Sequence, residues 1–410
     1  MIALRAMLFR VCGDGFRVFF TAAALMALLC MGWWAFWLAV QAAGGTVDET
    51  AFAPPPHLWH AHEMVFGYGA AALGGFFLTA VPNWTGAPGA QRRFLILAAF
   101  LWLAGRAAIW FSASLPPFAV AIIDLAFAPV LAFRLGRMMA RRPKPQNVVP
   151  LSLLGLFWAA NLAMHLEWTG MVEDAAHAGL RAGLLALAAL IVIIGGRVTP
   201  AFTRNAMRRA GREDRLPQDR PPLPPIAIGA AIALPALALW GAPAVITSGA
   251  AILAGGAALA RLAFWRGGWA ARDPLLWSMH AAYGLLGLGL VLWGASEAGH
   301  GSETAALHVI AIGGVGLMTL SVMTRATLGH TGRPLTAPRP VVGAFGCMIC
   351  AAAARAAAPL WGLETWYALA LIAAALWILA FALFLGALAA PLLGRSPTVQ
   401  GQDAGAPSGA

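Results

Sequence analysis

Long apolar runs dominate this chain and restrict what it can fold into. Residues 365–390, for example, contain no charged side chain. A helix of about 20 apolar residues crosses the hydrocarbon core of a bilayer, so each such run predicts a transmembrane helix. Only 10% of the residues are charged, 60% are hydrophobic and the mean hydropathy is +0.76, which leaves too little polar surface for a soluble globule. The sequence therefore predicts an all-α polytopic membrane protein.

The apolar runs and the polar segments between them predict about twelve spans. The predicted bounds are 17–41, 59–82, 93–112, 118–138, 148–166, 177–198, 222–241, 243–264, 273–296, 304–326, 339–359 and 364–390. We interpret residues 1–393 as a single transmembrane domain. Residues 394–410, GRSPTVQGQDAGAPSGA, are too polar to pack and predict a disordered cytoplasmic tail.

Lysine and arginine fall on alternate sides of the spans, and such residues are retained in the cytoplasm when they flank short loops. The basic set comprises Arg5, Arg10, Arg17, Arg92, Arg93, Arg134, Arg137, Arg141, Arg142, Lys144 and the segments 197–220, 261–272 and 325–339. The opposite side carries the acids Asp48, Glu49, Glu167, Glu173, Asp174, Glu297 and Glu303. Both termini are therefore predicted to be cytoplasmic. Because topology explains the net charge of +11, we expect no nucleic-acid partner.

Three spans that run inward end alike. Their cytoplasmic ends read TAVPNWTG (79–86), RVTPAFTR (197–204) and RATLGHTG (325–332), and the same register places His62 on His308. The match suggests three four-helix units, 17–138, 148–264 and 273–390, although a chance likeness of interface residues is the alternative. Proline-broken helix ends would line a cytoplasmic vestibule.

The rise of a helix, about 1.5 Å per residue, converts sequence position into depth and sorts the nine histidines. His57, His60, His62, His165, His177, His300 and His308 lie on or near the outer side. His280 lies deeper in its span, roughly 15 Å from the level of His308, so as a metal ligand it would belong to a second site. His330 lies at the cytoplasmic end of the repeated motif. An ionisable side chain within a span is a candidate site by default, because it is costly to bury in lipid.

Neutral imidazole is the commonest metal ligand and suits copper, haem iron and zinc. We therefore predict that at least two of His60, His62, His165 and His308 bind a shared cofactor; for any one of them, an interhelical hydrogen bond is the alternative. His60 and His62 lie about 200° apart on a regular helix, so the two rings face different neighbours unless the helix start is unwound. Glu63 is then an acceptor for a ligating histidine or a proton carrier.

Two further charged residues lie in the same outer layer. Arg106 and Asp124 are each within about two turns of the outer surface. They predict either a mutual buried ion pair or, for Arg106, a contact with an anionic group such as a haem propionate.

Several long motifs resemble the NnrS family of bacterial inner-membrane proteins. They are WHAHEMVFGYGAAALGGFFLTAVPNWTG (59–86), GGRVTPAFTRN (195–205) and LHVIAIGGVGLMTLSVMTRATLGHTGR (307–333), with weaker likeness in ANLAMHL (160–166) and LLWSMHAAYG (275–284). The motif positions are His60, His62, Glu63, Asn161, His165, Arg197, Thr203, Asn205, His280, His308, Arg325, His330 and Arg333.

The resemblance implies a haem- and copper-containing multi-pass protein of the bacterial inner membrane, associated with denitrification and with protection against nitric oxide and nitrosative stress. It leaves open which histidine holds which metal, haem b or copper. A membrane enzyme acting on nitric oxide, with a quinol or another electron donor, is one alternative. A secondary transporter is another, although transporters place their ionisable groups near the midplane rather than in the outer layer.

Overall fold

The computed structural model describes residues 2–143 and 145–394, and these residues form helices and turns without a β-strand. Lys144 and the predicted tail from residue 395 lie outside the described residues. The first third contains α1 (Ile2–Val11), α2 (Gly15–Ala42), α3 (Pro56–His62), η1 (Glu63–Gly69), α4 (Ala70–Thr85), α5 (Arg92–Trp110), η2 (Ser112–Ser114), α6 (Pro117–Leu125) and α7 (Phe127–Met139). The second contains α8 (Pro145–Trp168), α9 (Ala176–Leu190), η3 (Ile191–Gly195), α10 (Gly196–Arg209), α11 (Leu223–Leu239) and α12 (Ala244–Leu262). The last contains α13 (Gly267–Ala270), α14 (Pro274–Glu297), α15 (Glu303–His308), η4 (Val309–Gly316), α16 (Leu317–His330), α17 (Arg339–Ala357), η5 (Ala358–Leu360) and α18 (Leu363–Leu393).

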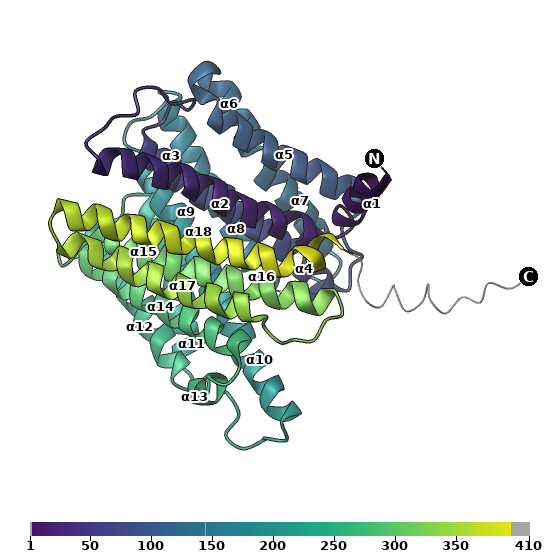
Figure 1. Cartoon of the computed structure of the whole chain (residues 1–410). Helices are drawn as coiled ribbons and strands as arrows, with labels where there is room; N and C mark the ends of the chain where they lie inside the picture. The colour runs from purple at the N-terminus through teal and green to yellow at the C-terminus, as the bar shows by residue number, and fades with distance from the viewer. Residues whose placement is uncertain (1, 144, 395–410) are drawn as a thin grey trace, which may run out of the picture.

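The helices form a bundle in which most elements run roughly along one direction (Figure 1). Among the described residues, eleven helices are long and apolar enough to cross a membrane, which confirms a polytopic all-α protein. The predicted seventh span is the shorter apolar helix α11, Leu223–Leu239. Its 17 residues reach about 25 Å, near the lower limit for a crossing.

Three long spans occupy the centre of the bundle, and we call them the central trio. They are span 2 (Pro56–Thr85), span 6 (Ala176–Arg209) and span 10 (Glu303–His330), and 72%, 67% and 72% of their most apolar stretches are buried. The peripheral helices pack on one another around the trio: α2 on α18, α18 on α17, α14 on α12, α12 on α11, and α7 on α8. The three spans of the central trio are the ones that carry the repeated motif, but the division of the chain into three four-helix units remains a prediction.

Each span of the central trio contains a π-helical segment, η1, η3 or η4. In the register of the repeated motif, η1 and η4 begin at equivalent positions, directly after His62 and His308. Such wide turns leave backbone groups to be satisfied by other donors, and they occur often at functional sites. The Trp102 indole donates to the Gly67 carbonyl at 2.9 Å, which stabilises the wide turn of η1.

The expectation that prolines break the cytoplasmic ends of these spans is wrong. Pro82 and Pro200 lie inside continuous helix, and α4 continues to Thr85 before Gly86 ends it with a φ of 67°. Proline removes one backbone hydrogen bond, and in a packed bundle this loss alone does not end a helix. The Thr85 hydroxyl donates to the Val81 carbonyl at 2.8 Å in this last turn.

Arg261 of α12 joins η3 to the linker between α10 and α11. Its buried guanidinium donates to the Val192 and Gly196 carbonyls at 3.4 and 3.0 Å, and to the Tyr283 hydroxyl at 2.9 Å. It also donates to both oxygens of Asp219 at 3.0 and 3.1 Å. One side chain therefore satisfies carbonyls of the wide turn and holds the linker against the bundle.

The two ends of the described chain meet at one end of the bundle. Arg17 donates to the carbonyls of Pro391 and Leu392 at 2.9 and 2.8 Å, so its guanidinium satisfies the last turn of α18. This contact agrees with both termini lying on the same side of a membrane.

Candidate functional site

A buried polar network lies near the predicted outer side, between the first five spans. It comprises His62 at the end of α3, Glu63 in η1, Arg106 in α5, Asp124 in α6, and Asn161 and His165 in α8. Every member is less than 9% exposed. We call these six residues the acid–histidine network. Their burial in an otherwise apolar bundle makes them a candidate functional site.

Arg106 joins the two carboxylates of the network. Its Nη1 donates to Glu63 and its Nη2 donates to Asp124. The predicted ion pair between Arg106 and Asp124 is therefore present and is extended to Glu63. The buried Nε of Arg106 has no partner among the described residues, and a contact of this side chain with a haem propionate stays a prediction.

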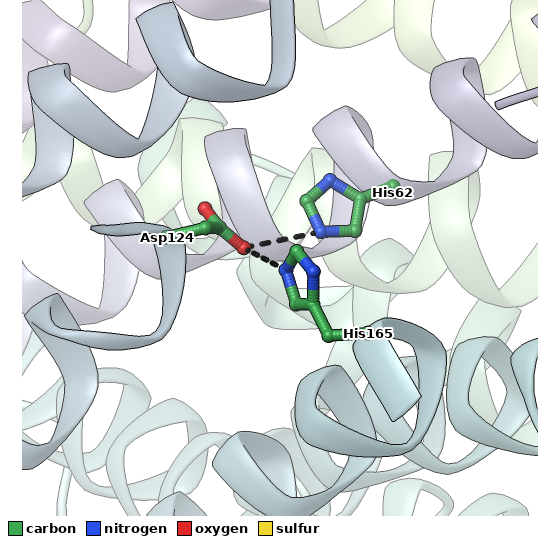
Figure 2. A group of neighbouring side chains, drawn as sticks. All are labelled: His62, Asp124 and His165. Carbon is green, nitrogen blue, oxygen red and sulfur yellow. Dashed lines mark hydrogen bonds and ion pairs between the residues drawn. The ribbon is translucent and has the colours of Figure 1, made fainter. Parts of the chain in front are cut away.

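His62 and His165 meet the same carboxylate from different helices (Figure 2). His165 Nε2 lies 2.9 Å from Asp124 Oδ2, and His62 Nε2 lies 3.3 Å from the same oxygen. The Asn161 amide nitrogen donates to this oxygen at 2.8 Å, which turns its own carbonyl oxygen toward His62 Nε2 at 2.9 Å. The donor atoms of His62, Asp124 and His165 all lie within 4.8 Å of one another.

The hydrogen bonds require one proton or cation in addition to a neutral His62 and an ionised Glu63. Nδ1 of His62 lies 2.9 Å from Glu63 Oε1, and its Nε2 faces the Asn161 carbonyl oxygen. Both contacts are satisfied if His62 is doubly protonated, if Glu63 carries the proton, or if a cation replaces one hydrogen. Two carboxylates, one guanidinium and one such charge make the network neutral overall, as a buried site in a membrane requires.

The glycine at position 67 leaves room for the contact between Arg106 and Glu63. A Cβ there would lie 3.1 Å from both Arg106 Nη1 and Met26 Cε, tighter than ordinary van der Waals contact. The small side chain therefore allows the guanidinium to pass η1 and reach Glu63.

A small cavity lies beside the network. Its volume is about 20 Å³, and its lining includes Arg106, Asp124 and Asn161 together with the aromatic rings of Phe66 and Trp102. Such a volume holds about one water-sized molecule. A diatomic molecule is of similar size, so the cavity offers space for a small ligand next to the network.

His60 points away from the network, as its helical phase predicts. Its ring stacks on Trp34 at 4.6 Å with an interplanar angle of 9°. Its Nδ1 is buried and has no hydrogen-bond partner among the described residues. His60 and His308 both interact electrostatically with Arg355, and His308 also interacts with His60. We call His60, His308 and Arg355 the His60 cluster.

The polar groups of the His60 cluster are incompletely satisfied. His308 Nδ1 donates to the Thr304 carbonyl at 2.7 Å, which leaves the lone pair of the ring on Nε2. Arg355 is 9% exposed, and its Nη1 has no partner in the described part of the chain. Two imidazoles with available nitrogens and a buried guanidinium form a donor set suited to a metal that carries an anionic group.

The other predicted site residues lie elsewhere. His280 Nδ1 lies 2.9 Å from the Leu276 carbonyl and its Nε2 lies 3.2 Å from the Trp265 carbonyl, so it contacts neither the acid–histidine network nor His60, and its role as a metal ligand stays a prediction. His330 stacks on Phe16, Arg325 lies over the Phe202 ring, and Thr203 donates to the Thr199 carbonyl. Arg197 and Asn205 are exposed, and Arg333 is half-buried at the cytoplasmic end of span 10.

Arg355 and Trp34 are the site residues that the sequence reasoning missed. Arg355 lies near the end of an apolar span, so the cost of burying an ionisable group could have identified it. Trp34 carries no such signal, because tryptophans near span ends are common interface anchors.

The chain matches a family model over nearly its whole length. The family model described as NnrS protein matches residues 10–396. No curated protein matches the chain. The match covers every span and both histidine clusters, and the chain therefore belongs to the NnrS family.

Proposed function

We propose that the acid–histidine network binds copper and the His60 cluster binds haem b, in a protein of the bacterial inner membrane. We further propose that the protein protects the cell against nitric oxide and nitrosative stress. Membership of the NnrS family supports a role in the nitric oxide response in general. The observation that carries the proposal is the convergence of His62, His165 and Asp124 within the bundle.

The donor set fits a small transition-metal ion. Bonds of about 2 Å to nitrogen and oxygen require donor atoms roughly 3–4 Å apart. The separations of 2.9 and 3.3 Å between Asp124 and the two imidazoles are close to this requirement. Two histidines and one carboxylate also suit iron(II) and zinc.

Charge favours copper in its monovalent form. The network needs one further proton or cation, and a monovalent ion in place of that proton keeps the network neutral. A divalent ion would leave an uncompensated positive charge in a low-dielectric environment, which is costly. Glu63 would accept the remaining N–H of His62, and Arg106 would hold both carboxylates in position.

The haem proposal is supported by the orphaned nitrogen of His60 and by Arg355. His60 and His308 would hold the haem through their imidazoles, and the unpaired Nη1 of Arg355 would bind a propionate. Bound copper in the acid–histidine network would supply a centre for nitric oxide. The cavity of about 20 Å³ beside Arg106 and Asp124 would admit a molecule of that size.

Metal analysis of site variants tests the proposal. The full chain, purified in detergent after growth with sufficient iron and copper, is analysed for copper, iron and zinc and by reduced-minus-oxidised absorption spectra. His165→Ala should lose copper and keep haem, whereas His308→Ala should lose haem and keep copper. Exposed His177 provides the matched control, and His177→Ala should keep both.

Three outcomes would contradict the proposal. The absence of both metals from the wild-type protein would refute it as a whole. Full haem in His60→Ala and His308→Ala would refute the ligand pair, and iron or zinc in place of copper would refute the argument from charge. Consumption of nitric oxide with a quinol donor would show in addition that the protein is an enzyme.

A further inference from the structure

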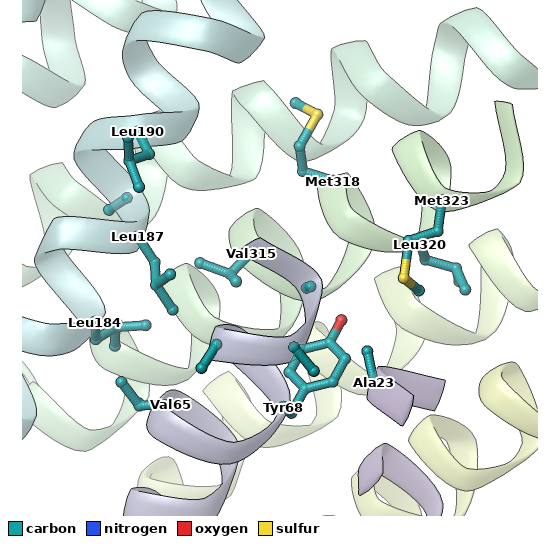
Figure 3. Close-up of a cluster of buried hydrophobic side chains, with 14 of the residues drawn as sticks. Ala23, Val65, Tyr68, Leu184, Leu187, Leu190, Val315, Met318, Leu320 and Met323 are labelled. Atoms are coloured by element: carbon teal, nitrogen blue, oxygen red, sulfur yellow. The ribbon is translucent and has the colours of Figure 1, made fainter. Parts of the chain in front are cut away.

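A second, larger cavity lies at the centre of the bundle, where the three spans of the central trio meet. Its volume is about 120 Å³, and its walls come from the central trio, through η1, α4, α9, η3, α10, η4 and α16, and from Phe20 of α2. Figure 3 shows part of the apolar packing around it, with Leu187 directed toward Val315, and Leu190 and Met318 nearby. We call this space the trio cavity.

The lining of the trio cavity is mostly buried but is not sealed on every side. Gly69, Leu187 and Val315 are buried, whereas Phe76 and Phe202 are partly exposed. The cavity therefore lies within the bundle and has some access from outside it.

Among the described residues, no charged side chain lines the trio cavity, and the one polar side chain there, Thr319, already has hydrogen-bond partners. The Thr319 hydroxyl donates to the carbonyls of Val315 and Gly316 at 2.8 and 2.9 Å, and it also bonds the Tyr68 hydroxyl. A buried water needs two to four polar partners, and this lining does not supply them. The cavity is thus unsuited to water, to ions and to hydrated anions.

We propose that the trio cavity is a binding site for one small, uncharged, apolar molecule, of a size between a dissolved gas and a benzene ring. Dry cavities of comparable volume lined by leucine, isoleucine and phenylalanine bind such molecules. The proposal does not depend on the metal sites, because the cavity and the acid–histidine network use different residues. If the proposed function is correct, nitric oxide belongs to the class of molecules that this cavity accepts.

Xenon under pressure is the probe, applied to crystals of the full-length protein in detergent. The expected result is one xenon site between Leu187, Val315 and Met318. Ala72→Leu extends a lining side chain into the cavity and should abolish the site. Ala107→Leu places the same substitution on an exposed surface of α5 and should leave it unchanged. Leu190→Ala enlarges the cavity and should increase xenon occupancy, which provides a test if the filled variant does not fold.

Each other outcome would overturn the proposal. Ordered water in the cavity, a lipid acyl chain that fills it, or xenon that persists in Ala72→Leu would exclude a dry site for a small molecule. Xenon binding requires neither haem nor copper. If the purified protein binds xenon in the trio cavity but contains no metal, the proposed function is refuted and the cavity proposal is not.

Discussion

Replacing Arg106 by glutamine should destabilise the protein by about 3–5 kcal/mol, the usual result of removing one partner from a buried ion pair. The guanidinium makes two charge-assisted hydrogen bonds, to Glu63 and Asp124. Each such bond contributes about 1.5–3 kcal/mol, which gives a loss of the same order. Without Arg106, two buried carboxylates share only one compensating proton or cation.

Equilibrium unfolding of the metal-free protein in mixed micelles with increasing dodecyl sulfate measures this loss. Arg181→Gln is the matched control, because Arg181 donates to both oxygens of Glu303 at 2.5 and 2.8 Å, with side chains 37% and 35% exposed. An exposed pair of this kind contributes about 0–1 kcal/mol. A double variant that also carries Glu63→Gln restores a neutral network and should recover most of the stability. If Arg106→Gln lowers the free energy of unfolding no more than Arg181→Gln does, Arg106 is not needed to balance the charges of the two buried carboxylates.

Three further predictions concern other contacts. Gly67→Ala should lower the free energy of unfolding by about 1–3 kcal/mol, because its Cβ would crowd Arg106 of the network. In the control Gly32→Ala, the Cβ would meet nothing within 4 Å, so the free energy of unfolding should not fall. Equal losses in the two variants would refute this role of Gly67. Tyr68→Phe removes the hydroxyl that bonds Thr319 and should cost about 1 kcal/mol in the same titration, so an unchanged unfolding curve would show that the bond contributes nothing. Asp219→Asn weakens the contact between the linker and α12, and limited trypsin digestion should cut the linker faster in this variant than in the wild type.

The membrane fold could be predicted from the sequence because apolar length and charge asymmetry are local signals. The predicted seventh span agrees least well with the structure, because its helix α11 ends at Leu239 and is the shortest of the twelve. The central position of spans 2, 6 and 10 was not predicted as such, although their repeated ends singled them out. Glycines on these spans permit the close approach: a Cβ at Gly69 would lie 2.9 Å from Leu187.

The candidate site could be predicted only in part. Depth placed His60, His62, His165 and His308 in one layer, and helical phase separated His60 from His62. Neither signal shows which helices are neighbours, so His62 and His165 could not be paired in advance, nor could His60 be placed beside Arg355. For Arg106 the sequence left two roles open; the structure shows its pairing with Glu63 and Asp124, and the propionate contact stays a prediction.

The π-helical segments change the direction in which the two halves of each central-trio span face. A wide turn accommodates about one more residue than an α-helical turn, so it rotates the remainder of the helix by about 100° relative to an unbroken α-helix. On the outer side of η1, span 2 directs His62 toward Asp124 of α6 and Asn161 of α8; on the cytoplasmic side, Ala72 and Phe76 face the trio cavity. Span 10 repeats the arrangement, with His308 above η4 and Met318 below it. Each helix thus has two independently oriented halves, and deleting a single residue from a wide turn would leave the composition almost unchanged while turning one half away from its partners.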